Sequence, residues 1–142
     1  LSVPEFSMRA YGGTAIGKAL GTLITERLVW IAEGETHALE ALPAGARAYT
    51  SAVAAFVPKA CREFWKHGVA GDRERMKQTL TSAIDPVVKV RSLRPGYGIS
   101  GIKVALEALG RAGGPVRPPG TPVAAEDRGS IGEIARKHAE SS

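Results

Sequence analysis

Two short strand-like runs flank one helix-like run between residues 27 and 51, and this pattern limits the folds that the chain can adopt. Residues 27–32 form an apolar run with β-branched and aromatic members, which is typical of a buried strand. Residues 35–42 predict a short helix, which Pro43 and Gly45 stop. Residues 47–51 predict a second strand. A strand, a helix and a strand in this order favour a parallel pair in an α/β sheet or barrel.

Everything after the second strand predicts helices, so we expect a chain that is mostly helical although it begins as an α/β protein. The strand–helix–strand unit has two edges that need neighbouring strands. We divide the chain into a poorly patterned segment 1–26, a βα region 27–69 and a helical region 70–142. A helix is expected to start near Val57, and a second helix is expected to be capped by Asp72 and kinked or split by Pro86. A third helix over 99–109 is closed by Gly110, and an extended loop over 113–122 follows it. The last helix spans 126–138 and turns Ile131, Ile134 and Ala135 inward.

Composition narrows the classes of function. The formal charge is +5, but basic and acidic residues alternate, as in 71–77, so we expect solvated helix faces and no nucleic-acid partner. No window approaches the roughly 18 consecutive apolar residues of a membrane span, and no membrane partner or secretory signal is expected. Cys61 is the only cysteine, which favours a reducing, cytoplasmic setting. We expect Cys61, Trp30 and Trp65 to be buried.

Four stretches carry a family resemblance. They are Ala-Tyr-Thr-Ser-Ala-Val-Ala-Ala-Phe-Val-Pro at 48–58, Gly-Asp at 71–72, Arg-Pro-Gly-Tyr-Gly-Ile-Ser-Gly-Ile-Lys at 94–103 and Gly-Gly-Pro-Val-Arg-Pro-Pro at 113–119. Because these four stretches occur in this order, the chain resembles the 5-dehydro-4-deoxyglucarate dehydratases of the dihydrodipicolinate synthase and N-acetylneuraminate lyase superfamily. The Gly-Tyr-x-x-Ser pattern that begins at Gly96 favours the dehydratases over other superfamily members.

This resemblance implies the C-terminal fragment of a (β/α)₈ TIM barrel, with about the last two strands and a C-terminal helical appendage, in a homo-oligomer. A whole barrel takes about 250 residues. This chain has 142 residues and does not begin with Met. We therefore expect a portion of something longer that is inactive alone, with residues 1–26 poorly ordered or engaged in association.

The resemblance also implies a reaction. The family removes water and carbon dioxide from 5-dehydro-4-deoxy-D-glucarate, a keto sugar acid, and forms 2,5-dioxopentanoate. A lysine on the sixth barrel strand attacks the keto group as the neutral amine and forms an imine. Lys18 is the candidate imine lysine by its order along the chain, and an exposed surface lysine is the other interpretation. We expect no metal or other cofactor, because His37, His67 and His138 are far apart in the sequence.

Three residues are candidate substrate contacts by the same resemblance. Gly34 matches a glycine at the end of the seventh strand, although Gly-Glu-Thr stands at 34–36 where the family has Gly-Leu-Pro-Thr. Thr50 and Ser51 match the carboxyl end of the eighth strand, where barrel enzymes place functional groups. Ser51 is the preferred contact. The alternatives are a plain turn glycine and small residues that allow tight strand packing.

Other residues have structural interpretations, and other functions stay open. Lys103 and Glu107 predict a surface pair at i,i+4 spacing, and Arg117 is expected to pin the proline-rich loop to the helices. A second function is another pyruvate-dependent aldolase or synthase of the same superfamily, against which the Gly96–Tyr97 pattern argues. A third is a non-enzymatic helical interaction module that associates through apolar faces.

Overall fold

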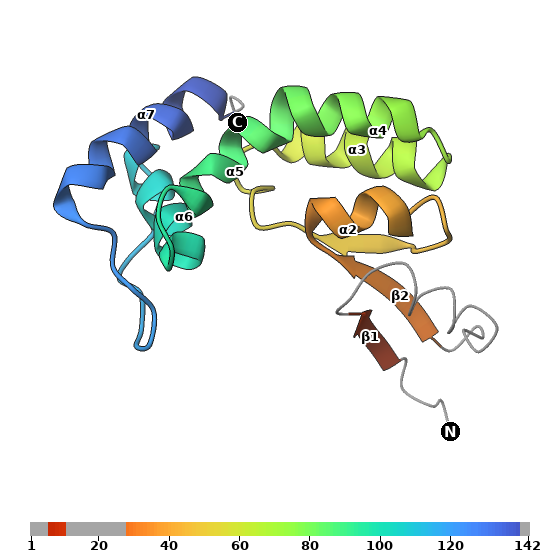
Figure 1. The fold of residues 1–142 in the computed structure, drawn as a ribbon, viewed down its shortest axis with the longest axis horizontal. Coiled ribbons are helices and arrows are strands. Elements are labelled where there is room, and N and C mark those ends of the chain that lie inside the picture. Colours follow the sequence, from red (N-terminus) through yellow and green to blue (C-terminus); the bar gives the residue numbers. More distant parts are fainter. Residues whose placement is uncertain (1–5, 11–27, 140–142) are drawn as a thin grey trace. The chain divides into compact units, whose positions relative to one another are not determined.

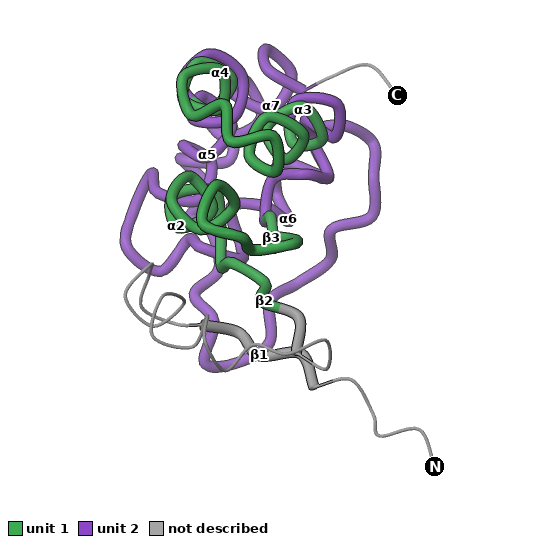
Figure 2. The backbone as a smooth tube through the Cα atoms, turned by 90° about the vertical axis from the view of Figure 1, so that its right-hand side faces the viewer, with its two compact units in different colours: residues 1–51, 61–80 green, residues 52–60, 81–142 purple. Residues whose placement is uncertain are grey.

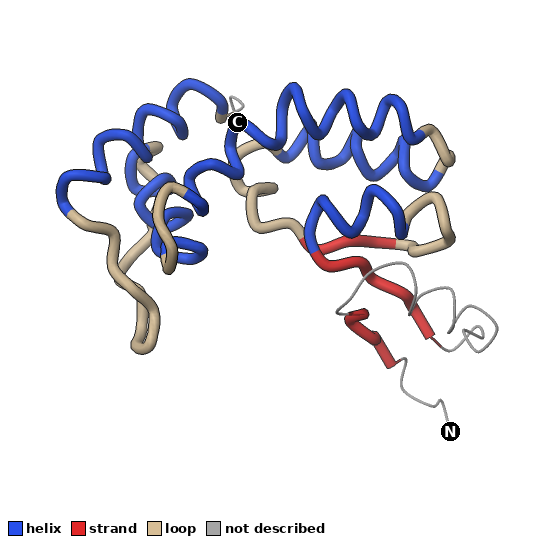
Figure 3. The backbone as a smooth tube through the Cα atoms, in the orientation of Figure 1, coloured by secondary structure: helices blue, strands red, loops and turns tan. Residues whose placement is uncertain are grey.

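The computed structural model describes residues 6–10 and 28–139, and its elements are labelled in Figure 1. The described strands and helix α2 come first, and helices alone follow β3 (Figure 3). The elements are strands β1 (Phe6–Ala10), β2 (Leu28–Glu33) and β3 (Ala48–Thr50), helices α2 (Gly34–Ala41), α3 (Pro58–Val69), α4 (Arg73–Thr79), α5 (Asp85–Ser92), α6 (Tyr97–Ala108) and α7 (Arg128–His138), the π-helix η1 (Leu80–Ile84) and the 3₁₀-helix η2 (Ala125–Asp127).

The described strands form one parallel sheet in the order β1–β2–β3. The parallel pair β2–β3 confirms the strand–helix–strand prediction, with Glu33 opposite Thr50 at the carboxyl end. β1 was missed. Its five residues, Phe-Ser-Met-Arg-Ala, contain no β-branched side chain and alternate for too short a stretch to give a clear period of two. Ladder hydrogen bonds to β2 supply what its own propensity lacks.

The chain divides into two compact units, coloured separately in Figure 2. Unit 1 comprises residues 1–51 and 61–80, and unit 2 comprises residues 52–60 and 81–142.

Unit 1 packs α2 against β2 and β3. The buried residues of α2 that face this packing include Ala38 and Ala41, whose small size lets helix and sheet approach closely. Trp30 and Ala32 are buried on β2 and alternate with half-buried residues, as a period of two requires. Trp30 thus confirms its prediction.

Trp65 does not lie in the core, so that prediction was wrong. It is 38% exposed, and its indole N–H donates to the Arg47 carbonyl at 2.9 Å. The apolar face of α3 is narrower than the sequence suggested, with Cys61 and Phe64 buried. Asp72 caps α4 as predicted, because its side chain accepts from the Arg75 N–H at 3.1 Å.

Unit 2 is built from α5, α6 and α7. Pro86 splits the helical run as predicted: a π-turn ends at Ile84 and α5 starts one residue before the proline. α6 approaches α5 closely at Gly101, where an added Cβ would lie 1.9 Å from the Val90 carbonyl oxygen. Gly110 ends α6 as predicted, with its N–H bonded to the Glu107 carbonyl.

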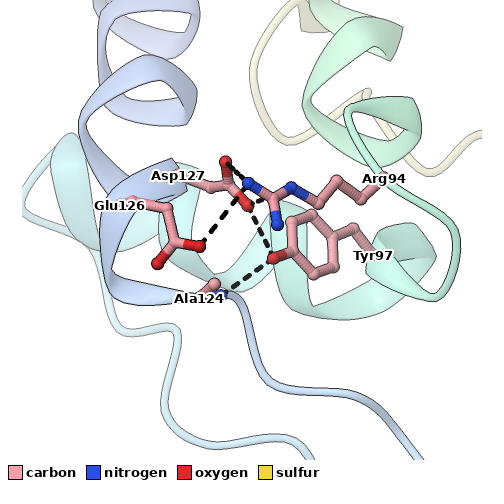
Figure 4. A network of polar contacts seen from close by, with 5 residues as sticks. All are labelled: Arg94, Tyr97, Ala124, Glu126 and Asp127. Carbon is pink, nitrogen blue, oxygen red and sulfur yellow. Dashed lines mark hydrogen bonds and ion pairs between the residues drawn. The ribbon is translucent and has the colours of Figure 1, made fainter.

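A polar network joins the end of α5 to the start of α7 (Figure 4). The Asp127 carboxylate is buried and accepts two bonds from the Arg94 guanidinium, Nε to Oδ2 at 2.7 Å and Nη2 to Oδ1 at 2.9 Å. The Tyr97 hydroxyl donates to Asp127 at 2.8 Å and accepts from the Ala124 N–H at 2.9 Å. The stretch 94–103, which the sequence singled out only as a motif, therefore meets the start of the last helix in one hydrogen-bonded cluster.

The loop between α6 and η2 is held differently from the prediction. Lys103 donates to the Gly113 carbonyl at 2.7 Å, and Glu107 pairs with Arg128 at 2.7 Å and accepts from the Gly114 N–H at 3.1 Å. The expected Lys103–Glu107 surface pair is thus replaced by contacts that bind the loop and α7. Arg117, expected to pin this loop, is exposed.

Candidate functional site

The carboxyl ends of β2 and β3 bring two of the predicted substrate contacts together. Gly34 follows the last residue of β2, and its N–H points to the Thr50 hydroxyl at 3.4 Å, a long hydrogen bond. The backbone at Gly34 has φ = +67°, which only glycine adopts without cost, so its role here is a turn that aims the amide at β3.

The alternation along β3 separates its side chains onto two faces of the sheet. The Tyr49 hydroxyl donates to the Cys61 carbonyl at 3.1 Å, and its ring meets Phe64 edge-on at 5.3 Å, so Tyr49 lies on the face covered by α3. Thr50 is the next residue and lies on the opposite face. The register places Glu33 beside Thr50 on that face, one position before the turn at Gly34.

Ser51 lies with the helix-covered groups. Its hydroxyl donates to the Glu35 carboxylate and lies 3.6 Å from the Cys61 sulfur. Glu35 is only 6% exposed although it is charged, and its place in the first turn of α2 puts it at the positive end of the helix dipole. Cys61 is buried, as expected.

The same cluster affects the Tyr49 phenol. Burial raises the pKa of Tyr49 above its ordinary value, and the neighbouring Cys61 and the negative charge of Glu35 act in the same direction. Tyr49 is thereby kept as a neutral hydrogen-bond donor to α3.

The structure thus gathers Gly34, Thr50 and Ser51 at one end of the sheet, whereas Lys18 lies outside the described residues. Sequence reasoning missed Glu33 and Glu35. The signal for Glu35 was present, because a charged residue stands where the family pattern has an apolar one. Within residues 6–10 and 28–139, no group of three or more His, Cys, Asp or Glu residues could hold a metal ion.

Parallel strands joined by a helix and followed by a helical region form the kind of arrangement found in one part of an α/β barrel. The chain belongs to the dihydrodipicolinate synthetase family, whose model matches residues 10–138. It corresponds to the C-terminal part of its relatives.

Two curated relatives carry the name "Probable 5-dehydro-4-deoxyglucarate dehydratase". The one from Rhizobium rhizogenes is 34% identical over 116 residues, which is 80% of this chain and 38% of the relative. The one from Rhizobium meliloti is 38% identical over 106 residues, which is 72% of this chain and 35% of the relative. The chain therefore spans little more than a third of the length of these relatives.

The fold comparison agrees. Dihydrodipicolinate synthase from Bacteroides thetaiotaomicron superposes with a TM-score of 0.76 over 92% of this chain and 46% of that one, at 14% identity. This likeness shows the fold, which confirms the expected relation to the C-terminal part of a TIM barrel. Among the described helices, none has the length and apolar character to cross a membrane.

Proposed function

We propose that this chain is the C-terminal part of a lyase that removes water and carbon dioxide from 5-dehydro-4-deoxy-D-glucarate through a lysine imine. The observation that carries the proposal is the identity of 34% and 38% to relatives named for that activity. The strand ends add chemical support. The Gly34 N–H donates to the Thr50 hydroxyl oxygen at the carboxyl end of parallel strands, and the Thr50 O–H can in turn donate to a substrate carboxylate.

Within this proposal, Thr50 is a stronger candidate for the substrate contact than the sequence suggested. It lies on the sheet face opposite α3, whereas Ser51 is engaged by Glu35 and Cys61. Ser51 stays a predicted contact, and so does Gly34. We also keep as proposals a homo-oligomeric state, a cytoplasmic location and the division into 1–26, 27–69 and 70–142.

We further propose that the chain alone does not form the imine. β1 lies two strands before β3 in the sheet, which is the place of the sixth strand if β3 is the eighth. Its five residues include arginine but no lysine. A guanidinium stays protonated and cannot attack a keto group. Lys18 is the remaining candidate by order along the chain.

A borohydride trap tests the imine. The folded chain, checked by circular dichroism, is incubated with pyruvate or with 5-dehydro-4-deoxyglucarate, reduced and measured by intact-mass spectrometry. A full-length relative serves as the positive control. We expect an unchanged mass for the chain and an adduct for the relative. A stoichiometric adduct on the chain that Lys18→Arg abolishes would show that the imine chemistry is present and that the second proposal is wrong.

A chimaera tests the substrate. The N-terminal part of the Rhizobium rhizogenes relative, through the crossover that follows its sixth strand, is joined to residues 28–142 of this chain. We expect it to release carbon dioxide from 5-dehydro-4-deoxyglucarate, and we expect Thr50→Val to lower kcat/KM about tenfold, more than Ser51→Ala does. A folded chimaera that condenses pyruvate and leaves the sugar acid untouched would favour the aldolase alternative. A folded chimaera that acts on neither would favour the interaction module.

A further inference from the structure

Unit 2 contains a hollow that the proposed lyase chemistry does not use. Its volume is about 310 Å³, and it lies between α6, the loop that begins at Gly114, and the start of α7. This volume is at the lower end of the range for small-molecule sites, about 300–1,000 Å³. The walls combine valine and proline side chains with a few polar groups, a composition that small-molecule sites commonly have.

Ser100 supplies the most telling of these polar groups. It lines the hollow, it is 4% exposed, and its hydroxyl oxygen has no hydrogen-bond partner among the described residues. A buried hydroxyl left unpaired destabilises the folded state. Replacement by alanine would remove this cost. The hydroxyl oxygen is itself buried, so the Ser100 side chain must turn about χ1 to donate to a molecule in the hollow.

The charges around the hollow indicate what that molecule carries. Glu107 and Arg128 neutralise each other in a 2.7 Å ion pair. Lys103 lies one helical turn after Ser100 and gives one bond, to the Gly113 carbonyl at 2.7 Å. An ammonium group has three donors, so Lys103 retains positive charge and donors on the side of the helix that Ser100 shares. The charged side chains that line the hollow, Lys103, Glu107 and Arg128, therefore carry one net positive charge.

We propose that this hollow binds a small monocarboxylate with an apolar body. The carboxylate accepts from the Lys103 ammonium and the Ser100 hydroxyl, and the apolar body lies against Val104 and Val123, which also line the hollow. A second hollow of about 580 Å³ borders the same loop, but its lining includes no buried residue. The proposal goes beyond the lyase function and does not depend on it.

The test uses benzoate, with benzamide as a matched neutral probe of the same shape. The ¹⁵N-labelled chain is titrated with each, and the amide resonances of Ser100, Lys103 and Gly114 are followed. We expect saturable shifts with benzoate and binding at least about tenfold weaker with benzamide, since a charge-assisted bond is lost. Equal binding of the two probes, or no binding of benzoate at millimolar concentration, would overturn the proposal.

Two serine variants separate binding from folding. Ser100→Ala removes the unpaired hydroxyl, so we expect its thermal stability to be equal or higher, while benzoate affinity falls about three- to tenfold. Ser92→Ala, on the exposed end of α5 and away from the hollow, should leave affinity unchanged. A Ser100→Ala variant that binds benzoate as well as the parent does would contradict the assigned contact, whatever its stability.

Discussion

Among the residues whose burial the structure describes, each compact unit buries one carboxylate, and the two carboxylates have different hydrogen-bond partners. In unit 2, Asp127 is 9% exposed and receives two bonds from Arg94 and one from Tyr97. In unit 1, Glu35 is 6% exposed, and its described partner is the hydroxyl of Ser51. Within residues 6–10 and 28–139, no ion pair to Glu35 is found.

The two units therefore differ in how much a charged contact contributes to their stability. A buried ion pair with several hydrogen bonds is costly to break, because one charge is then left unpaired. A carboxylate held by one hydroxyl and a helix dipole has much less to lose. In unit 2, the cluster of Arg94, Tyr97 and Asp127 thus fixes helices against one another. In unit 1, the polar groups lie at strand ends, where barrel enzymes place functional groups.

The largest expected effect concerns the close contact of α5 and α6 in unit 2. Gly101→Ala in unit 2 would place a Cβ 1.9 Å from the Val90 carbonyl oxygen, so α5 and α6 must separate. We expect a loss of about 3 kcal/mol in the free energy of unfolding, measured by urea titration. Gly98→Ala is the matched control on the same helix, because its added Cβ meets nothing within 4 Å. Since alanine has a higher helix propensity than glycine, Gly98→Ala should leave stability unchanged or raise it. An equal loss in both variants would contradict the close approach as the cause.

The next effect tests the charge side directly. Asp127→Asn removes the ion pair with Arg94 but keeps the side-chain volume, and we expect a loss of about 2 kcal/mol. This is below the range for a fully buried pair because the Arg94 side chain is half exposed. Glu126→Gln, which removes the exposed partner of Arg94 at 3.5 Å, should change stability by less than about 0.5 kcal/mol. Similar losses for Asp127→Asn and Glu126→Gln would mean that the buried ion pair stabilises unit 2 no more than the exposed one.

A smaller effect concerns pH in unit 1. Because the pKa of Tyr49 is raised in the folded state, folding favours its neutral form. That contribution is complete below the unfolded tyrosine pKa of about 10 and falls as the pH rises above it. We expect stability to fall by at most about 1 kcal/mol between pH 10 and 11, discounted because Tyr49 is half-buried. Urea titrations of Tyr49→Phe at these two pH values should show a shallower decline.

The smallest expected effect is Glu35→Gln. The amide oxygen of glutamine can still accept from Ser51, so only the interaction with the helix dipole is lost. We expect a change of less than about 1 kcal/mol by urea titration, clearly below that of Asp127→Asn. A loss as large as that of Asp127→Asn would mean that Glu35 is paired more strongly than its hydroxyl contact indicates.

Much of this fold was predictable from local signals. Asp72 capped α4, Pro86 split the helical run and Gly110 ended α6, because each acts on the backbone within a few residues of itself. The parallel pair β2–β3 followed from the strand, helix and strand order. β1 escaped, since its strand character comes from pairing with β2, a contact between distant residues.

Predictions about single side chains fared less well wherever partners came from elsewhere in the chain. Trp65 has the spacing of a core residue, yet it is exposed and bonded to Arg47. Lys103 and Glu107 have the spacing of a helix pair, yet each finds a partner in the following loop or helix. Spacing along one helix says which residues share a face but not what covers that face.

The family resemblance, the order of the elements from β2 onward and the candidate residues at the strand ends followed from the sequence. Folding alone brought Glu35 beside Ser51 as a buried group and placed Ser100 on the wall of a hollow. The physical reason is the range of the interactions. Caps, turns and strand patterns are set by neighbours in the chain, whereas burial and hydrogen bonding depend on groups that only folding brings together.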